Sequence, residues 1–246
     1  MTMRPVQLLR PLRGPARPAS CLPACAAEIV DATGQRQAWV ALGNPLLNSG
    51  PEGLHSDARD EQARWIVTGS GTLADEAFMA EPRNWMGPGR AALDRLVERT
   101  AAEIAGTSMR WLMTPHCRDV LSDVQGVRRF VLDHADAPIG IALNPAALFE
   151  RGMLRHVEDH MTRIVSGLGP ICALIMLQDI APGAADHPEA RVELCAPGDG
   201  LLPWAHVAGL LRRHVPSDTP IVLRAEDVPG ATAQSAAQVA ERLGLI

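Results

Sequence analysis

Apolar residues follow two different periods along this chain. Some short runs are apolar at every position, such as Ile171–Leu177, whereas Arg90–Ala105 places Leu93, Val97 and Ile104 at the spacing of one helix face. A short, fully apolar run is typical of a strand that is buried on both faces, as in a parallel sheet. A spacing of three to four residues is typical of a helix that buries one side. The pattern therefore predicts strands and helices that follow each other in turn.

Applied to the whole chain, the pattern predicts eight strands. They are Val6–Leu9, Gln37–Leu42, Trp65–Thr68, Met109–Met113, Pro138–Leu143, Ile171–Leu177, Val192–Cys195 and Pro220–Leu223. The predicted helices are Cys21–Ala32, His55–Arg64, Arg90–Ala105, Val120–Leu132, Phe149–Leu168, Pro203–His214 and Thr232–Leu243. Because alternation of strand and helix is the order of parallel βαβ units, we predict an α/β fold: a (β/α)8 TIM-type barrel of parallel strands inside an outer ring of helices.

The length supports one such barrel. The chain has 246 residues, close to the ~250 typical of this architecture, and no linker or internal repeat divides it. We therefore expect residues 1–246 to form a single barrel domain. Its N-terminal part is degenerate, because residues 1–20 contain four Arg and four Pro. That segment is expected to be poorly ordered or to supply only a short first strand.

The amino-acid composition excludes some kinds of site and disfavours some kinds of partner. All 23 basic residues are Arg, so a Schiff-base lysine, a P-loop lysine and a lysine general base are excluded. The net charge of −5 argues against nucleic acid as the main partner. No apolar run reaches the ~18 residues of a membrane span. The five cysteines match no disulfide framework or zinc knuckle, which favours a reducing, cytoplasmic compartment.

Functional groups in such a barrel lie at the C-terminal ends of the strands. Three residues there are candidates for catalysis: His116, Asp179 and Glu226. The candidates for substrate binding are Thr68, Thr114, Asn144, Gln178 and Arg224. Most of this set consists of hydroxyls and neutral amides, whereas a hydrolytic or isomerising metal site needs three or four His, Asp or Glu ligands. We therefore expect no metal and no other cofactor.

Each catalytic candidate also has a structural interpretation. His116 is suited to a general base if it has an orienting partner, and is otherwise a loop histidine. Asp179 directly follows a buried strand, but an Asp at that place also caps turns. Glu226 is adjacent to Asp227, and two neighbouring carboxylates are commonly a solvated pair. Arg224, at the end of the last strand, is suited to binding an anion.

Several segments in a fixed order resemble the xylose isomerase-like barrel superfamily. This superfamily includes sugar phosphate isomerases and epimerases and the endonuclease IV type of AP endonuclease. The resemblance covers about two-thirds of the chain, from Arg64 to Glu226. The segments that carry it are Arg64–Gly71, Trp111–His116, Gly140–Leu148, Leu174–Ile180, Pro197–Gly200 and Ile221–Arg224. It implies a barrel with a divalent metal at its mouth that acts on a sugar or sugar phosphate.

The chain departs from this superfamily where metal ligands are expected. The resemblance assigns a Glu, an Asp, a His and a second Glu to positions held here by Thr114, Asn144, Met176 and Arg224. It also assigns a His to the position of Thr68. A guanidinium in place of a metal-binding carboxylate would put a cation where the metal sits. The resemblance thus implies a barrel from which the metal site has been lost.

Three functions remain open at this point. The first is a sugar phosphate isomerase/epimerase-like barrel without its metal, which binds a sugar or sugar phosphate with or without turnover. The second is an active isomerase or epimerase that works by proton transfer. The third is an endonuclease IV-like repair protein, which the acidic charge balance and the missing ligands disfavour. The sequence leaves the substrate, the oligomeric state and the presence of catalysis open.

Overall fold

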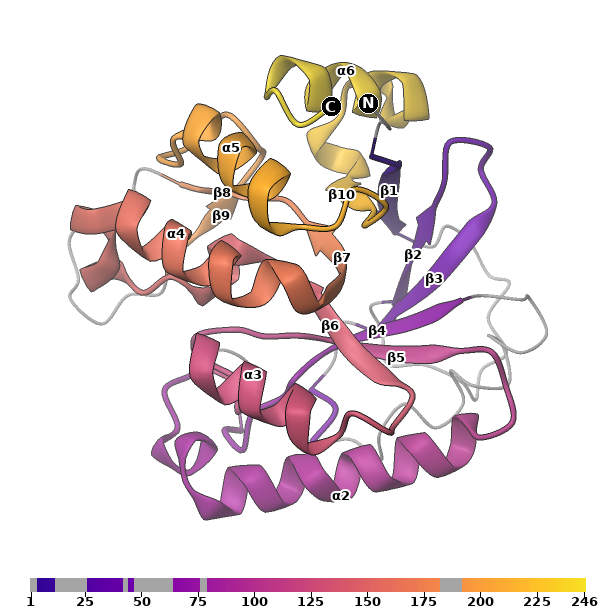
Figure 1. Cartoon of the computed structure of the whole chain (residues 1–246), viewed down its shortest axis with the longest axis vertical. Coiled ribbons are helices and arrows are strands. Elements are labelled where there is room, and N and C mark those ends of the chain that lie inside the picture. Colours follow the sequence, from indigo (N-terminus) through magenta and orange to yellow (C-terminus); the bar gives the residue numbers. More distant parts are fainter. Residues whose placement is uncertain (1–3, 12–25, 42–43, 47–63, 76–78, 182–191) are drawn as a thin grey trace.

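Eight strands close into a barrel, and helices cover its outside (Figure 1). The computed structural model describes residues 4–11, 26–41, 44–46, 64–75, 79–181 and 192–246. The strand order around the barrel is β1-β10-β7-β6-β5-β4-β3-β2, which returns to β1. The predicted TIM-type fold is therefore confirmed. The predicted helix His55–Arg64, apart from Arg64 itself, lies outside the described part, as do Cys21, Cys25 and most of residues 1–20.

The strands and helices have the following bounds. The barrel strands are β1 (Val6–Pro11), β2 (Ala26–Val30), β3 (Arg36–Ala41), β4 (Trp65–Gly69), β5 (Arg110–Thr114), β6 (Ile139–Leu143), β7 (Cys172–Met176) and β10 (Ile221–Arg224). The α-helices are α2 (Gly87–Ile104), α3 (Val124–Asp133), α4 (Val157–Leu168), α5 (Trp204–His214) and α6 (Ala233–Arg242). Two short strands, β8 (Asp179–Ile180) and β9 (Leu194–Cys195), form a separate sheet.

The interior of the barrel is a small apolar core made of strand residues alone. Its buried members are Ala27, Ile29, Ala38, Val40, Trp65, Val67, Leu112, Ala142, Leu174 and Val222. Alternate residues of a strand point to opposite faces, so the intervening positions pack outward against the helices in a second, larger core. The barrel is therefore filled below its mouth.

Helix positions follow the hydrophobic pattern closely, but two helix starts differ from the prediction. Helix α2 buries the predicted face. Helix α3 begins at Val124 because the carboxylate of Asp123 accepts hydrogen bonds from the N–H groups of Gln125 and Gly126, which caps the helix there. Helix α4 begins at Val157, after a 3-10 turn over Arg151–His156. These differences leave the order of elements unchanged.

The prediction of a helix over Cys21–Ala32 is wrong, because Ala26–Val30 is strand β2. This strand runs antiparallel to both β1 and β3, whereas the other neighbours in the barrel are parallel. Alanine-rich sequence favours a helix locally, but pairing on both edges of β2 outweighs that preference. Glu28 accepts from Arg10 at 2.7 Å and also pairs with Arg36, one residue from each neighbouring strand.

The prediction of Val192–Cys195 as a barrel strand is also wrong. Its last two residues form β9, which pairs antiparallel with β8 beyond the end of β7. Both residues of β9 are only partly buried, and the run is too short to span the barrel wall. The count of eight barrel strands is nevertheless right, because β2 takes the place of the predicted seventh strand.

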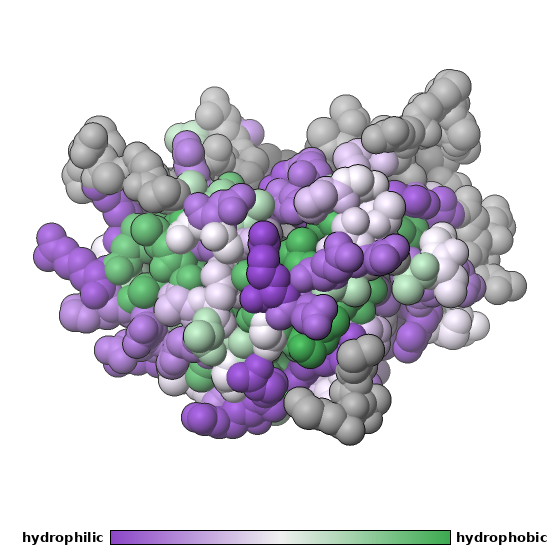
Figure 2. Space-filling view, turned by 90° about the horizontal axis from the view of Figure 1, so that it is seen from above, coloured by the Kyte–Doolittle hydropathy of each residue, from purple (hydrophilic) through white to green (hydrophobic). Residues whose placement is uncertain are grey.

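The outer surface is mixed in polarity. Figure 2 shows the molecule from above the view of Figure 1, the side on which α6 lies. On this face hydrophilic residues alternate with hydrophobic patches. Large apolar side chains that are exposed in the described part are Met79, Trp85, Met86, Leu132 and Leu201. None of the described helices combines the length and the apolar character needed to cross a membrane.

Arg4 fastens the start of the barrel to the end of helix α5. Its guanidinium donates to the carbonyl oxygens of Pro216, Leu211 and Val215 at 2.6, 2.8 and 2.7 Å. Carbonyls at the C-terminal end of a helix lack partners within the helix and attract positive charge. Only 8% of Arg4 is exposed, so water does not easily replace these bonds.

We predict that Arg4→Met lowers the free energy of unfolding by about 2–4 kcal/mol, because buried carbonyl groups lose their donor. Chemical denaturation measures this change. Arg213→Met is the matched control, since Arg213 is an exposed residue in the last turn of the same helix, and it should change stability by less than about 1 kcal/mol. Equal effects of the two substitutions would contradict the role given to Arg4.

Candidate functional site

A cavity of about 530 Å³ opens at the C-terminal ends of the barrel strands. Six of the eight predicted site residues line it: Thr68, Thr114, His116, Asn144, Gln178 and Arg224. Each lies at the end of its strand or just beyond it, where this fold places functional groups. The remaining two, Asp179 and Glu226, are not among the lining residues.

Asn144 and Gln178 form an amide pair in the cavity wall. The Asn144 side chain donates from Nδ2 to Gln178 Oε1 at 2.8 Å. Asn144 is only 4% exposed, and its Oδ1 has no hydrogen-bond partner. A buried acceptor without a donor costs free energy, so this oxygen is suited to accept a bond from a ligand hydroxyl.

Thr114 and Thr68 differ in how their hydroxyls are placed. Thr114 Oγ1 lies 4.0 Å from the sulfur of Met176, a weak acceptor. The hydroxyl of Thr68 accepts from Trp111 Nε1 and donates to the carbonyl of Gly69, both at 2.9 Å. The Thr68 hydroxyl is therefore already engaged, whereas that of Thr114 remains suited to a ligand.

His116 begins the turn that follows β5. Its Nδ1 accepts from the backbone N–H of Arg118 at 3.1 Å. An imidazole nitrogen that accepts cannot carry the proton, so the neutral ring holds its hydrogen on Nε2. His116 thus has the orienting partner that a functional histidine requires.

Asp119 is a buried carboxylate in the cavity wall that the sequence analysis missed. Its Oδ2 accepts from Ser70 Oγ at 3.2 Å and from the N–H of Gly71 at 3.0 Å. Burial raises the pKa of Asp119 to about 6, although these hydrogen bonds act in the opposite direction. The sequence does place Asp119 in the same loop after β5 as His116, which could have marked it as a candidate. Its burial, however, depends on a loop about 50 residues earlier in the sequence.

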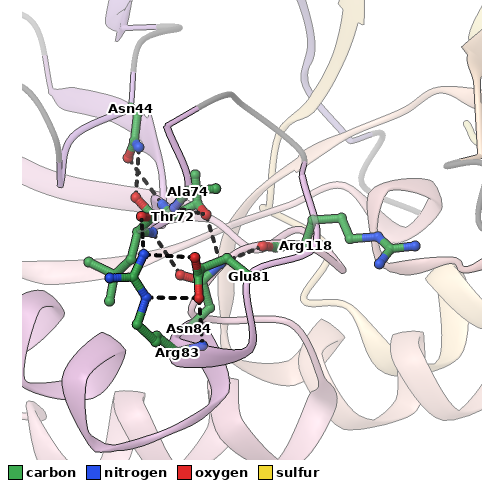
Figure 3. Close-up of polar contacts among 8 residues, drawn as sticks. Asn44, Thr72, Ala74, Glu81, Arg83, Asn84 and Arg118 are labelled. Atoms are coloured by element: carbon green, nitrogen blue, oxygen red, sulfur yellow. Dashed lines mark hydrogen bonds and ion pairs between the residues drawn. The ribbon is translucent and has the colours of Figure 1, made fainter.

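A polar network supports that loop from below (Figure 3). Asn44 donates to the carbonyl of Thr72 at 2.7 Å and accepts from the N–H of Thr72 at 3.1 Å. Asn84 donates to the Thr72 hydroxyl at 2.7 Å and to the carbonyl of Arg118 at 2.8 Å. Gly71 has a φ of +82°, and a Cβ there would lie 2.6 Å from Leu46. The network joins the loops after β3, β4 and β5 into one rim.

Arg224 is surrounded by acidic groups. It pairs with Glu226 and lies 3.8 Å from Asp227, measured from Nε to Oδ2. Burial raises the pKa of Asp227, and the Arg224 charge lowers it. The side chain of Glu226 is half exposed and, as this pairing indicates, acts on Arg224 rather than on the cavity. Much of the positive charge of Arg224 is therefore compensated.

Asp179 organises the β8–β9 sheet and the loop after it. Its carboxylate is fully buried and accepts from the N–H groups of Ile180, Gly198 and Leu202 and from Trp204 Nε1, at 2.7 to 3.1 Å. Four donors on two oxygens leave little capacity for a substrate. The geometry thus favours the structural interpretation of Asp179.

The four positions at which the resemblance expects metal ligands lie around this one cavity: Thr114, Asn144, Met176 and Arg224. Divalent cations such as Mg²⁺ and Mn²⁺ prefer carboxylates, and Zn²⁺ prefers His, Cys and carboxylates. A hydroxyl, an amide, a thioether and a guanidinium do not make such a site. The part of the chain that the structure describes contains no cluster of three or more His, Cys, Asp or Glu suited to a metal. These residues do not fit the metal of the superfamily.

Solved structures with this architecture decide the fold assignment. A D-psicose 3-epimerase crystallised in the presence of D-fructose is 12% identical, with a TM-score of 0.57 over 84% of this chain and 78% of that one. A magnesium complex of a xylose isomerase-like TIM barrel protein from Mycobacterium smegmatis is 12% identical, with a TM-score of 0.55 over 84% and 74%. This chain has the xylose isomerase-like TIM barrel fold.

A third structure shows how much shorter this chain is than some proteins of the fold. The xylose isomerase domain protein from Planctomyces limnophilus is 13% identical, with a TM-score of 0.56 over 78% of this chain but only 61% of that protein. No family model matches the sequence, and no curated protein does. At these identities the xylose isomerase-like barrels define the architecture, and the function has to come from the site itself.

We predict that Asp179→Asn lowers the free energy of unfolding by about 2–4 kcal/mol, because the new amide NH₂ faces N–H donors that lose their acceptor. Denaturation followed by tryptophan fluorescence measures this, since Trp204 donates to Asp179. Asp199→Asn is the control, because this carboxylate lies in the neighbouring turn and is exposed. A variant with unchanged stability would mean that Asp179 is not a structural residue.

Proposed function

We propose that this protein is a sugar isomerase/epimerase-like barrel that has lost its divalent-metal site and binds a neutral sugar or polyol at the barrel mouth. The observation that carries the proposal is the lining of the cavity. A hydroxyl, an amide, a thioether and a guanidinium occupy the places where ligands of a metal are expected, and the Oδ1 of the amide, Asn144, is unpartnered.

The chemistry of the lining suits hydroxyl groups. A sugar hydroxyl both donates and accepts, and Asn144 offers an acceptor while Gln178 and Thr114 offer donors. Apolar side chains, among them Val40, Val67 and Leu194, also line the cavity, which suits the C–H faces of a sugar. Pockets that combine apolar walls with a few placed polar groups are typical of small-molecule sites.

The charge balance favours a neutral ligand over a sugar phosphate. Among the described residues, the charged groups that line the cavity are Asp119, Glu193 and Arg224. Arg224 is already compensated by Glu226 and Asp227. A phosphate would therefore enter a site with no uncompensated cation to bind it.

A cytoplasmic location forms part of the proposal. The described cysteines, Cys117, Cys172 and Cys195, are free thiols, and thiols persist in reducing compartments. Burial raises the pKa of Cys117 to about 11 and that of Cys172 to about 12, so both are inert packing residues. The cysteines thus add no redox chemistry to the proposed function.

We predict that D-fructose binds to the purified protein in calorimetry and that EDTA does not change its affinity. D-fructose 6-phosphate should bind more weakly, because its phosphate meets no free cation. Asn144→Ala should weaken fructose binding about five- to tenfold, the loss of one hydrogen bond. Gln125→Ala, which removes an exposed amide on helix α3, is the control. Elemental analysis should find no stoichiometric Zn, Mn or Mg.

Two results would contradict the proposal. One is about one equivalent of metal that survives desalting, since it would mean that ligands other than the aligned residues hold a cation. The other is a stronger affinity for the phosphate ester, which would mean that the charge of Arg224 is available to ligands.

The position of the four residues around one cavity leads to a gain-of-function prediction. The quadruple change Thr114→Glu, Asn144→Asp, Met176→His and Arg224→Glu should create a site for Mn²⁺ or Zn²⁺. Its carboxylates repel one another without a cation, so the variant should be less stable than the wild type and should recover when metal is added. Thermal melts with and without metal measure this. Thr114→Glu alone is the control, and a quadruple variant that folds without any metal response would refute the alignment.

A further inference from the structure

A second cavity lies outside the barrel, between helices α3 and α4, which Figure 1 shows side by side. Its volume is about 770 Å³, and small-molecule sites commonly measure about 300–1,000 Å³. The cavity shares none of its described lining residues with the cavity at the barrel mouth. The sugar site proposed above therefore makes no use of it.

The floor of this cavity is apolar and tightly packed. Cys117, Leu148 and Ile164 line it, and each is at most 6% exposed. A Cβ at Gly167 of α4 would lie 2.5 Å from Cγ1 of Val124 on α3, so the glycine allows the two helices to approach this closely. The cavity is thus a groove with a fixed floor between two packed helices.

Trp85 lines the same cavity, although 48% of this residue is exposed. It ends the 3-10 turn Pro82–Trp85. The preceding residue, Asn84, is buried and donates to the Thr72 hydroxyl and to the carbonyl of Arg118. A half-exposed indole on an anchored turn offers a stacking surface for a flat aromatic ring.

Two exposed arginines from facing helices also line the cavity, Arg128 of α3 and Arg163 of α4. Nη1 of Arg128 donates to the carbonyl of Gly167 at 3.2 Å. The Arg128 guanidinium therefore reaches α4 about one helical turn from the position of Arg163. Within the described residues neither arginine is paired with a carboxylate. Two guanidinium groups thus contribute to one groove without an anionic partner.

The two carboxylates in the lining are engaged elsewhere. Asp123 accepts from the N–H groups of Gln125 and Gly126 at 2.8 and 2.9 Å, which caps α3. The side chain of Glu150 accepts from the N–H of Met153 at the start of the 3-10 turn before α4. N–H donors at the start of a helix balance negative charge. These acids are therefore stabilised without Arg128 and Arg163, whose charge remains available to a ligand.

We propose that the groove between α3 and α4 binds a small aromatic anion. Its flat ring stacks on Trp85, and its phosphate or carboxylate is held by Arg128 and Arg163. A guanidinium matches the geometry of both kinds of anion, and the apolar floor accommodates the rest of the ring system. This site is independent of the sugar site proposed at the barrel mouth.

Calorimetry with two probes tests the proposal. AMP carries an aromatic base and a phosphate, and indole-3-acetate carries an aromatic ring and a carboxylate. At least one of them should bind at least tenfold more tightly than its uncharged counterpart, adenosine or indole. Inorganic phosphate and acetate, which lack the ring, should bind weakly. The tighter of the two probes shows whether the natural anion is a phosphate or a carboxylate.

Substitutions in the groove locate the bound probe. Arg163→Met and Arg128→Met should each weaken binding about tenfold, the loss of a charge-assisted contact. Trp85→Ala should weaken it by a similar factor, whereas Trp85→Phe should keep most of the affinity because an aromatic ring remains. The matched controls are Arg155→Met and Leu132→Ala, which change exposed residues outside the lining and should leave the affinity unchanged.

These variants separate binding from folding. Arg128, Arg163 and Trp85 are all exposed, so their substitution should leave the melting temperature close to that of the wild type. A structural role alone would lower the melting temperature without a selective loss of the charged probes. Loss of affinity for AMP or indole-3-acetate at an unchanged melting temperature is the expected result.

Several results would overturn the proposal. One is the absence of binding by either probe, and another is an equal affinity for the charged and the uncharged member of each pair. A third is binding that survives both Arg163→Met and Trp85→Ala. Binding that is weakened by Asn144→Ala instead would place the anion at the barrel mouth. None of these results depends on fructose binding, so the proposed function is tested separately.

Discussion

A closed barrel requires every strand to be hydrogen-bonded on both edges, and here β2 meets this requirement by running against its neighbours. Strand β1 is paired in parallel with β10 on one side and needs a partner on the other. Strand β2 supplies it and is in turn paired with β3. The ion pairs of Glu28 with Arg10 and Arg36 reinforce both edges. Because the barrel is closed, the ends of its strands form a ring. The place of each strand in that ring determines which side chains surround the cavity.

The electrostatic character of the mouth follows from this ring. The strand ends supply an amide, a hydroxyl and a thioether, and the one guanidinium, Arg224, is compensated by acids that follow it in sequence. The described lining also holds the buried carboxylate of Asp119, which accepts hydrogen bonds from Ser70 and Gly71. A mouth of this kind offers neutral polar groups together with one buried carboxylate, Asp119, and one oriented imidazole, His116. The proposed recognition of a sugar is compatible with these groups.

Much of the barrel could be predicted from the sequence because apolar runs mark buried strands and their ends. Six of the predicted site residues lie around the cavity for the same reason. Strand β2 was missed because its alanines resemble a helix and its partners are distant in sequence. The directions of Asp179 and Glu226 depend on the β8–β9 pairing and on a 3-10 turn over Ala225–Asp227, and neither leaves a periodic signal. Asp119 was missed because a contact with Ser70 buries it.

Because β2 runs antiparallel to β3, the turn that joins them and the cavity lie at different ends of the barrel. The tight turn between β2 and β3 lies at the N-terminal end of β3, on the opposite side of the barrel from the cavity. Asp31 closes this turn by accepting from the N–H groups of Thr33 and Gln35, and Gly34 has a φ of +83°. The turn is exposed from Ala32 to Gln35, and none of these residues lines the cavity. It is therefore a natural insertion point for a tag or a fused domain, one that leaves the opposite end of the barrel free to bind.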